Sequence, residues 1–120
     1  MFRVRRIYDD ILPVNKAAIR EVAQILVEQF PAAKNTTADV VAEKLRNPFK
    51  MHFRSILYVA ENDRGQLQGL ALLLHDPVVK FCFLEYVASK KSIIGRGVGA
   101  ALYEYVRNES VALKAEGLVF

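Results

Sequence analysis

Three alternate glycines stand where an apolar segment passes into an amphipathic one. The run Ile94–Ala101 reads Ile-Gly-Arg-Gly-Val-Gly-Ala-Ala. Glycine has no Cβ, so the backbone can approach a ligand closely, and the first turn of a helix offers N–H groups without intrahelical partners. That end of a helix also carries a partial positive charge. The turn therefore predicts a binding site for an anion such as a phosphate or pyrophosphate.

Two common phosphate-binding motifs do not fit this run. A P-loop requires Lys followed by Ser or Thr after its last glycine, whereas Gly99 is followed by Ala100 and Ala101. A dinucleotide fingerprint can be written as Gly95-x-Gly97-x-x-Ala100, but it opens a βαβ unit with an acidic residue about 20 positions further on. We expect the chain to end too soon for that unit. A purely structural alternative is a tight strand-to-helix turn.

The run resembles the loop between a strand and a helix in the GNAT acyltransferase superfamily. That loop has Gln or Arg, two residues, Gly, one residue, and then Gly or Ala. The segment Phe83–Ser89 resembles the strand before the loop, and Gly97–Leu102 resembles the start of the helix. One position departs from the pattern, because Ile94 stands where the family has Gln or Arg. Arg96, inside the loop, could supply the cation instead.

The resemblance implies transfer of an acetyl group from acetyl-CoA, a co-substrate, to an amine, with no metal ion. In this family the strand before the loop splays from its neighbour, so that its backbone can hydrogen-bond the pantetheine arm, while the turn holds the pyrophosphate. The cofactor-binding residues implied in this way are Val87, Ala88, Ser89, Gly95, Arg96, Gly97, Val98, Gly99 and Ala100.

Such a reaction needs a base, because a lysine amine with a pKa of about 10.4 is protonated at neutral pH. Glu85 is the only acid in the apolar segment 81–88. Burial among Phe83 and Val87 would make its carboxylate a stronger base, so Glu85 is the predicted catalytic residue. The structural alternative places Glu85 on the opposite face from Tyr86, where it pairs with an arginine or accepts backbone hydrogen bonds.

The remaining candidate side chains have structural interpretations. The tyrosines predicted to be core or rim aromatics are Tyr58, Tyr86 and Tyr103. His52 falls in a predicted loop and His75 at a strand end, without the spacing of metal ligands, so no metal site is expected. Cys82 lies in an apolar run and is expected to pack as a small hydrophobic residue.

Apolar patterning predicts strands over 2–8, 55–60, 67–75 and 81–88. The cluster 61–65, Glu-Asn-Asp-Arg-Gly, predicts a hairpin turn. The strand 81–88 is apolar at nearly every position, which is typical of a strand covered on both faces in the middle of a sheet. A fifth strand is expected to begin at Leu118.

A first helix is predicted over 16–30, with Asn15 as its cap. A second, shorter helix is predicted to follow Thr36 or Thr37 and to stop before the Asn47-Pro48 pair. A third is predicted over 97–116, with Gly117 as a left-handed C-cap. Their predicted inward residues are Ile19, Val22, Ala23, Leu26 and Phe30 in the first helix, Val40, Val41 and Leu45 in the second, and Val98, Ala101, Leu102, Tyr105, Val106, Ala112 and Leu113 in the third.

The fold class is therefore α/β, a mixed α+β arrangement: a GNAT-like, mostly antiparallel central sheet flanked by helices. The family continues beyond the fifth strand, so residues 1–120 are expected to be one GNAT-like domain truncated at the start of that strand. The segments 53–60 and 81–86 also resemble acetyltransferase segments fused ahead of deacetylase-type amidohydrolases in some bacterial proteins.

The formal charge of +4 is spread along the 120 residues, apart from clusters at Arg3, Arg5 and Arg6 and at Lys90 and Lys91. A nucleic-acid-binding protein should show a basic stripe or a docking motif, so the N-terminal cluster is interpreted as solvated surface charge. Lys90 and Lys91 flank the glycine turn and could attract a polyanion. No segment could span a bilayer and no secretory signal opens the chain, so a cytoplasmic protein without membrane or nucleic-acid partners is expected.

Two functions remain open. The first is an N-acetyltransferase acting on a small-molecule or protein amine, favoured by the glycines and Glu85. The second is a non-catalytic acyl-CoA-binding or partner-binding regulatory module of a larger protein, favoured by Ile94 and the early chain end. The unfinished sheet edge also predicts a homo-oligomer or pairing with another chain.

Overall fold

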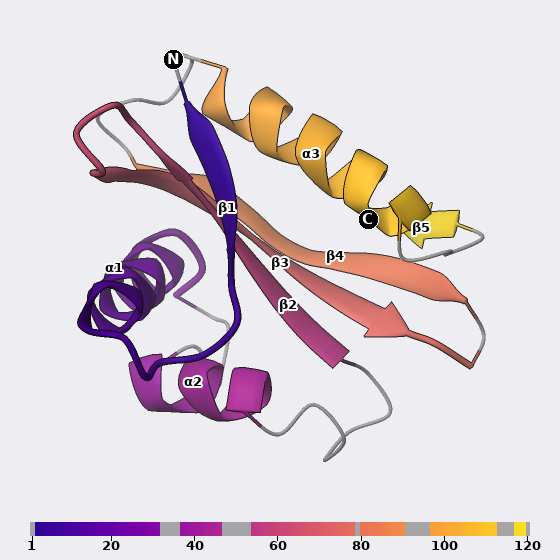
Figure 1. Cartoon of the computed structure of the whole chain (residues 1–120), viewed down its shortest axis with the longest axis horizontal. Coiled ribbons are helices and arrows are strands. Elements are labelled where there is room, and N and C mark those ends of the chain that lie inside the picture. The colour runs from indigo at the N-terminus through magenta and orange to yellow at the C-terminus, as the bar shows by residue number, and fades with distance from the viewer. Residues whose placement is uncertain are drawn as a thin grey trace.

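A computed structural model describes residues 2–31, 37–46, 54–78, 80–90, 97–112 and 117–119. Within these ranges a five-stranded sheet carries helices on both faces (Figure 1). The predicted α/β class and the predicted order of elements are confirmed. The elements are β1 (Arg3–Ile7), α1 (Pro13–Gln29), α2 (Ala38–Arg46), β2 (Arg54–Glu61), β3 (Leu67–Asp76), β4 (Phe81–Ser89), α3 (Val98–Ala112) and β5 (Gly117–Val119).

The strands lie in the spatial order β1-β2-β3-β4-β5. The first four pair antiparallel, and β5 pairs parallel to β4, so the sheet is mixed as predicted. Parallel neighbours need a long crossover, which α3 provides between β4 and β5. Figure 1 shows α1 and α2 on one face of the sheet and α3 on the other.

Each face of the sheet has its own hydrophobic core. Under α1 and α2, the helix stripe Ile19, Val22 and Leu26 packs with inward residues of β2 and β3. Under α3, Leu102 and Val106 pack with the opposite faces of the same strands. The strand residues that alternate between the two cores include Leu57, Val59, Leu70 and Leu72 on the first face, and Ile56, Tyr58, Ala71 and Leu73 on the second.

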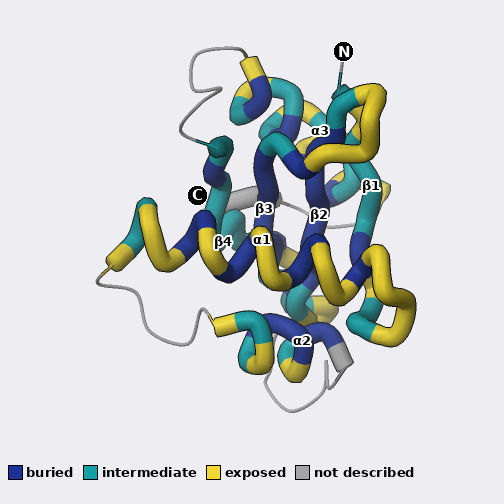
Figure 2. The backbone as a smooth tube through the Cα atoms, turned by 90° about the vertical axis from the view of Figure 1, so that its left-hand side faces the viewer, coloured by how far each residue is buried: buried dark blue, intermediate teal, exposed yellow. Residues whose placement is uncertain are grey.

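The prediction that strand 81–88 is covered on both faces is wrong. In β4 only Cys82 and Ala88 are buried, and the other residues are half-buried or, at Phe81, exposed. The strands buried on both faces are β2 and β3, because they lie in the middle of the sheet between the two helix layers (Figure 2).

Arg5 of β1 accounts for two further differences from the predictions. Asn15 does not cap α1, whose N-cap is Leu12; it is buried, and its Oδ1 accepts a hydrogen bond of 2.8 Å from Arg5 Nη1. Glu61 is not a turn residue but the buried end of β2, where its Oε1 accepts a 2.7 Å hydrogen bond from Arg5 Nε. A polar partner therefore makes burial of both side chains possible.

The helix predicted over 97–116 spans Val98–Ala112 in the structure. Its buried residues include Val98, Leu102 and Val106, as predicted, whereas Ala112 is exposed. Gly117 begins β5 and is not a helix cap. The prediction for Leu113 lies outside the described residues.

Candidate active site

The glycine turn leads directly into the first turn of α3. The first helical hydrogen bond runs from Ala101 N to Gly97 O, at 3.0 Å. The N–H groups of Val98, Gly99 and Ala100 therefore precede the hydrogen-bonded part of the helix and can bind another acceptor. Gly97 has a φ of +83°, which favours glycine, and among the described residues no atom lies within 4 Å of a Cβ built at Gly97 or Gly99.

The turn thus has unpaired donors beside open space, and these features fit a phosphate group. Val98 is buried against the sheet, whereas Gly97 and Ala100 are exposed. Two other residues predicted to bind the cofactor, Gly95 and Arg96, lie outside the described residues.

Gly69 of β3 sets the position of this turn on the sheet. A Cβ at Gly69 would lie 2.7 Å from the Ala88 carbonyl oxygen and 2.8 Å from Val98 Cγ1. Only glycine lets the start of α3 pack so closely over β3 and β4. Nothing in the local sequence marks Gly69, because the need for glycine arises from elements far apart in the chain.

One edge of β4 is open along most of its length. β3 pairs with β4 from Phe81 to Ser89, whereas β5 pairs only with Phe81–Phe83. Figure 1 shows β5 beside the end of β4 that lies away from the start of α3. Among the described residues, none pairs with the β5 side of 84–89. This open edge is the feature that the splay implied by the resemblance requires.

The hydrogen-bond pattern shows which backbone groups face the open edge. Lys90 N donates to Gln68 O of β3 at 2.9 Å, and successive residues of an antiparallel strand alternate in direction. The polar groups of Ala88 therefore point towards β3, and those of Val87 and Ser89 point away from it. Of the three strand residues predicted to bind the pantetheine arm, Val87 and Ser89 have the suitable backbone direction.

Gln29, at the end of α1, already occupies part of this edge. Its Nε2 donates a short hydrogen bond to the Ser89 carbonyl oxygen. The two residues are 60 positions apart, and no sequence motif marks the contact. The N–H of Ser89 and both polar groups of Val87 are left to face the open edge.

A β-bulge changes the direction of Glu85. Leu72 and Leu73 are consecutive in β3, but they pair with Tyr86 and Leu84 of β4. Glu85 is therefore the extra residue of the bulge. The Glu85 carboxylate then meets Lys44 of α2, and the Tyr86 ring meets Phe30 of α1. Both side chains lie on the face under α1 and α2, so the expectation that they occupy opposite faces is wrong.

Glu85 pairs with a lysine and not with the arginine considered in the structural alternative. Lys44 Nζ lies 3.7 Å from Glu85 Oε1, and the two side chains are 21% and 26% exposed. Oε1 itself is buried and has no hydrogen-bond partner in the described part of the chain. The site therefore contains a carboxylate with unused acceptor capacity next to a primary amine. Lys44 was not predicted as a site residue, since nothing in the sequence of α2 alone marks it.

Aromatic rings line the site beside Glu85. The Phe30 and Tyr86 rings lie 5.0 Å apart between centroids, tilted by 57°. Burial, assisted by the Glu85 charge, raises the pKa of Tyr86, so its hydroxyl stays protonated at neutral pH. It is a half-buried aromatic at the rim of the site, as predicted.

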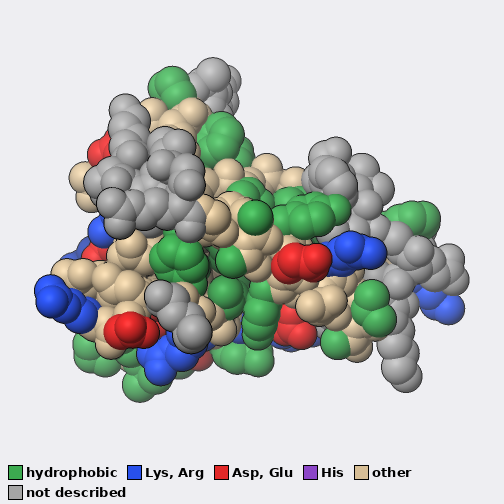
Figure 3. All heavy atoms as spheres, turned by 90° about the horizontal axis from the view of Figure 1, so that it is seen from above, with side chains coloured by type: hydrophobic (Ala, Val, Ile, Leu, Met, Phe, Trp, Pro, Cys, Tyr) green, Lys and Arg blue, Asp and Glu red, His purple; other side chains and the backbone are tan. Residues whose placement is uncertain are grey.

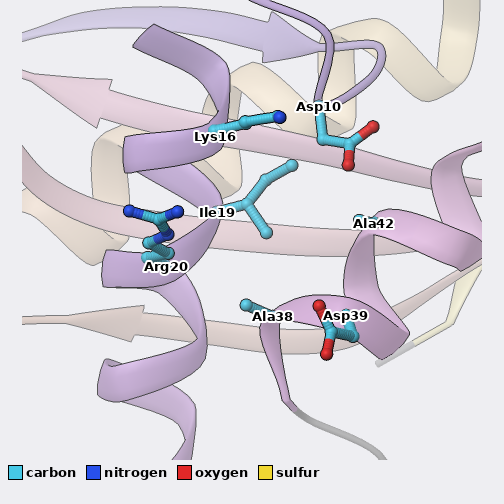
Figure 4. Close-up of a pocket in the computed structure, with 7 residues that line it drawn as sticks. All are labelled: Asp10, Lys16, Ile19, Arg20, Ala38, Asp39 and Ala42. Carbon is cyan, nitrogen blue, oxygen red and sulfur yellow. The ribbon is translucent and has the colours of Figure 1, made fainter. Parts of the chain in front are cut away.

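A second hollow lies between α1 and α2, away from the glycine turn. This cleft has a volume of about 180 Å³ and is lined by Asp10, Lys16, Ile19, Arg20, Ala38, Asp39 and Ala42. Figure 4 shows Lys16 and Asp10 pointing towards one another at one end of it. None of the predicted site residues lines the cleft, so it is separate from the candidate site on β4.

The other residues singled out from the sequence are structural. Tyr58 is buried, and burial together with Glu109 raises its pKa. Cys82 is fully buried, as predicted, and burial raises the pKa of its thiol. His75 is buried at the end of β3, where burial and Arg54 lower its pKa. Within the described ranges, no group of His, Cys, Asp and Glu side chains could hold a metal ion.

The surface in Figure 3 carries scattered charge. On that face Lys and Arg side chains lie apart from one another, with hydrophobic, Asp and Glu side chains between them. The face therefore offers no continuous basic stripe among the residues described. In the same part of the chain, no helix combines the length and apolar character needed to cross a membrane.

No family model and no curated protein sequence matches the chain. Solved structures do. An IAA acetyltransferase from Bacillus cereus has a TM-score of 0.67 at 18% identity, covering 98% of this chain and 63% of its own. GCN5 of Tetrahymena has a TM-score of 0.77 at 15% identity, covering 97% of this chain and 68% of its own.

A third similar structure is a GNAT family acetyltransferase from Brucella melitensis, solved in complex with acetyl-CoA. Its TM-score is 0.71 at 20% identity, covering 98% of this chain and 73% of its own. At such identities the similarity concerns the fold, over about two thirds of the length of these proteins. The chain has the fold of the GNAT-family acetyltransferases.

Proposed function

We propose that this chain is the acetyl-CoA-binding part of an N-acetyltransferase, within a single domain that includes residues 1–120. The observation that carries the proposal is the open edge of β4, which runs from the end of β5 to the first turn of α3. The open strand edge can hydrogen-bond amide groups of a ligand, and the helix N-terminus next to it can bind a phosphate. Together they suit a ligand that has an amide-containing arm with a phosphate at one end. Acetyl-CoA has this chemistry, and one of the similar structures was solved with it.

In the proposed complex the pyrophosphate accepts hydrogen bonds from Val98, Gly99 and Ala100. The pantetheine amides pair with the outward backbone groups of Val87 and Ser89, extending the sheet pattern as an additional strand would. Arg96 and Gly95 belong to the same proposed site by their place in the sequence. The acyl end then lies towards the bulge.

The chemistry at the bulge is the transfer of an acetyl group to an amine. Glu85 takes a proton from the ammonium of the acceptor, and the neutral nitrogen attacks the thioester carbonyl carbon. The new C–N bond replaces the C–S bond, and the thiolate leaves with a proton. The aromatic pair Phe30 and Tyr86 borders this position.

The alternative is a non-catalytic module that binds an acyl-CoA or a partner chain. The Lys44–Glu85 ion pair favours this alternative, because a carboxylate held by an ammonium is less available as a base. Both functions share the binding step, whereas only the first transfers the acetyl group.

Calorimetric titration with acetyl-CoA tests the shared step. Gly99 is helical and has open space at its Cβ position, so Gly99→Ala should leave the melting temperature unchanged or slightly higher. The same methyl group would stand against the phosphates, and we expect acetyl-CoA affinity to fall by about tenfold or more. Unchanged affinity in the folded variant would remove the turn from the binding site.

A matched pair of glycines provides the control. Gly65 and Gly97 have φ values of +74° and +83°, and in the described part of the chain neither has an atom within 4 Å of a built Cβ. Alanine should therefore cost similar stability at both positions, about 1 kcal/mol. Only Gly97→Ala should weaken acetyl-CoA binding, because Gly65 lies in the turn between β2 and β3. An assay with a panel of amines then separates transfer from binding alone.

A further inference from the structure

The structure places a primary amine of the chain itself on the proposed base. Lys44 Nζ and Glu85 Oε1 are 3.7 Å apart, and about three quarters of each side chain is shielded from solvent. Among the described residues, no hydrogen-bond donor occupies Oε1. Lys44 therefore stands where an acceptor amine would have to be for Glu85 to take its proton.

We propose that Lys44 is a self-acetylation site: with acetyl-CoA bound, the chain transfers an acetyl group to its own Lys44. This inference rests on the function proposed above. It names an acceptor amine within the protein itself, and it assigns the Lys44–Glu85 ion pair a role in the reaction.

The path of the proposed ligand leads to Lys44. The start of α3 lies over Ala88, as the contacts around Gly69 show. From Ser89 to Glu85 the strand advances four residues, which is about 13 Å at the usual rise per residue. An extended arm that follows the open edge away from α3 over that distance ends at the bulge. There the Lys44 amine approaches from α2, on the face of the sheet that Glu85 shares.

The bonds and protons of this transfer balance with acetyl-CoA and Lys44 as the only reactants. Glu85 removes one proton from the Lys44 ammonium, and the neutral nitrogen attacks the carbonyl carbon of the thioester. The C–N bond forms as the C–S bond breaks, and the nitrogen loses its second proton. One of the two protons ends on the CoA thiolate and the other in solvent. The products are acetylated Lys44 and CoA thiol.

Acetylation would also change the site for later acceptors. An acetylated lysine is neutral, so the ion pair with Glu85 would be lost. The carboxylate would then be available to an external amine that carries a positive charge. The first transfer would convert a site closed by its own lysine into one open to substrate.

The test follows acetylation of each lysine by peptide mass spectrometry after the full chain is mixed with isotope-labelled acetyl-CoA. Lys16 is the reference, because it is an exposed lysine of α1 and lies on the cleft between α1 and α2, apart from the candidate site. We expect Lys44 to react at least tenfold faster than Lys16. The rate constant should be independent of protein concentration, since donor and acceptor lie in one chain.

Three variants identify the chemistry. In Glu85→Gln, Lys44 should react no faster than Lys16, and Glu85→Asp, which withdraws the carboxylate by one methylene, should give an intermediate rate. Circular dichroism checks that each variant is folded. If Glu85→Gln does not fold, Glu85→Asp provides the test of the carboxylate. Lys44→Arg keeps the positive charge and should remove the fast-reacting site.

The outcomes separate this inference from the function it rests on. If calorimetry shows acetyl-CoA binding but Lys44 reacts at the rate of Lys16, self-acetylation is wrong and the binding function stands. A Lys44 rate that rises with protein concentration would assign the transfer to a second chain and overturn the proposal as well. If acetyl-CoA does not bind at all, both proposals fail.

Discussion

The bulge in β4 is the residue-scale feature with the greatest chemical consequence. In a regular strand Glu85 and Tyr86 would point to opposite faces of the sheet. The extra residue directs both towards α1 and α2, where a carboxylate with an unused acceptor lies beside the ring of Tyr86 and the amine of Lys44. A carboxylate, a shielded amine and an open backbone edge thus meet at the bulge.

If Glu85 is the base, Glu85→Gln should lower the rate of acetyl transfer to an external amine by 10²–10⁴-fold, because the amide cannot accept the proton. Acetyl-CoA affinity, measured by calorimetry, should stay unchanged, since the predicted binding contacts are elsewhere. Glu21→Gln is the matched control. Glu21 also pairs with a lysine at 3.7 Å, that of Lys90, but lies on the surface of α1. A Glu85→Gln enzyme with near wild-type rates across pH would leave this residue a structural role.

His75 gives a pH-dependent contribution to folding. Burial and the nearby Arg54 lower its pKa in the folded protein, and Asp76 opposes them only in part. The unfolded chain therefore binds a proton at higher pH than the folded one does. The stabilising contribution is complete above the unfolded pKa of about 6.5 and is lost as the pH falls through the lower folded value. Urea unfolding between pH 7 and pH 5 should show stability falling, with a weaker fall in His75→Gln. An equal slope in both proteins would contradict this assignment.

At the scale of elements, the contact between α3 and β3 determines where the anion-binding turn lies. Gly69→Ala should destabilise the fold by about 1–3 kcal/mol, because the added methyl overlaps the Ala88 carbonyl and the Val98 side chain. The start of α3 must shift outward to accommodate it, so acetyl-CoA affinity should fall as well. Thermal unfolding and calorimetry measure the two effects. Gly99→Ala, in the first turn of α3 but with open space at its Cβ position, should lose affinity without losing stability. Identical behaviour of the two variants would argue against separate roles for the two glycines.

Elements whose packing repeats locally could be predicted from the sequence. The stripe Ile19, Val22 and Leu26 predicts α1, and the apolar segments 55–60 and 67–75 on either side of a turn cluster predict the β2–β3 hairpin. Element ends are less predictable, because they depend on partners far away in the chain. Asn15 and Glu61 are buried through Arg5, which is 10 and 56 positions from them.

The candidate site likewise combines features that the local sequence predicts with features that depend on distant parts of the chain. The glycine turn and the strand before it form one continuous motif, so their proximity could be predicted. Lys44 and Gln29 come from helices that reach β4 only in the folded chain, and the direction of Glu85 depends on a bulge that its apolar neighbours do not reveal. The resemblance to segments fused with deacetylases stays a prediction.

At the scale of the whole molecule, helices and neighbouring strands shield some strands of the sheet from solvent more than others. Both faces of β2 and β3 are covered by helices, whereas β4 is half-buried and borders a short strand. Because β5 pairs only with Phe81–Phe83, the same edge of β4 beyond Phe83 has no strand partner among the described residues. Unpaired N–H and C=O groups along such an edge favour pairing with another chain.

We therefore expect the 120-residue chain to self-associate through this region, in competition with acetyl-CoA. A strand from a second chain and the pantetheine arm would use the same backbone groups of β4 at Val87 and Ser89, so occupancy by one excludes the other. Light scattering over a concentration series should show an average mass that rises above the 13.6 kDa of one chain. Saturating acetyl-CoA should shift that mass back towards the monomer, whereas Gly99→Ala should weaken the shift because it binds the ligand less well. A chain that is monomeric at every concentration, or an association that acetyl-CoA leaves unchanged, would show that the open edge of β4 is not the surface through which chains pair.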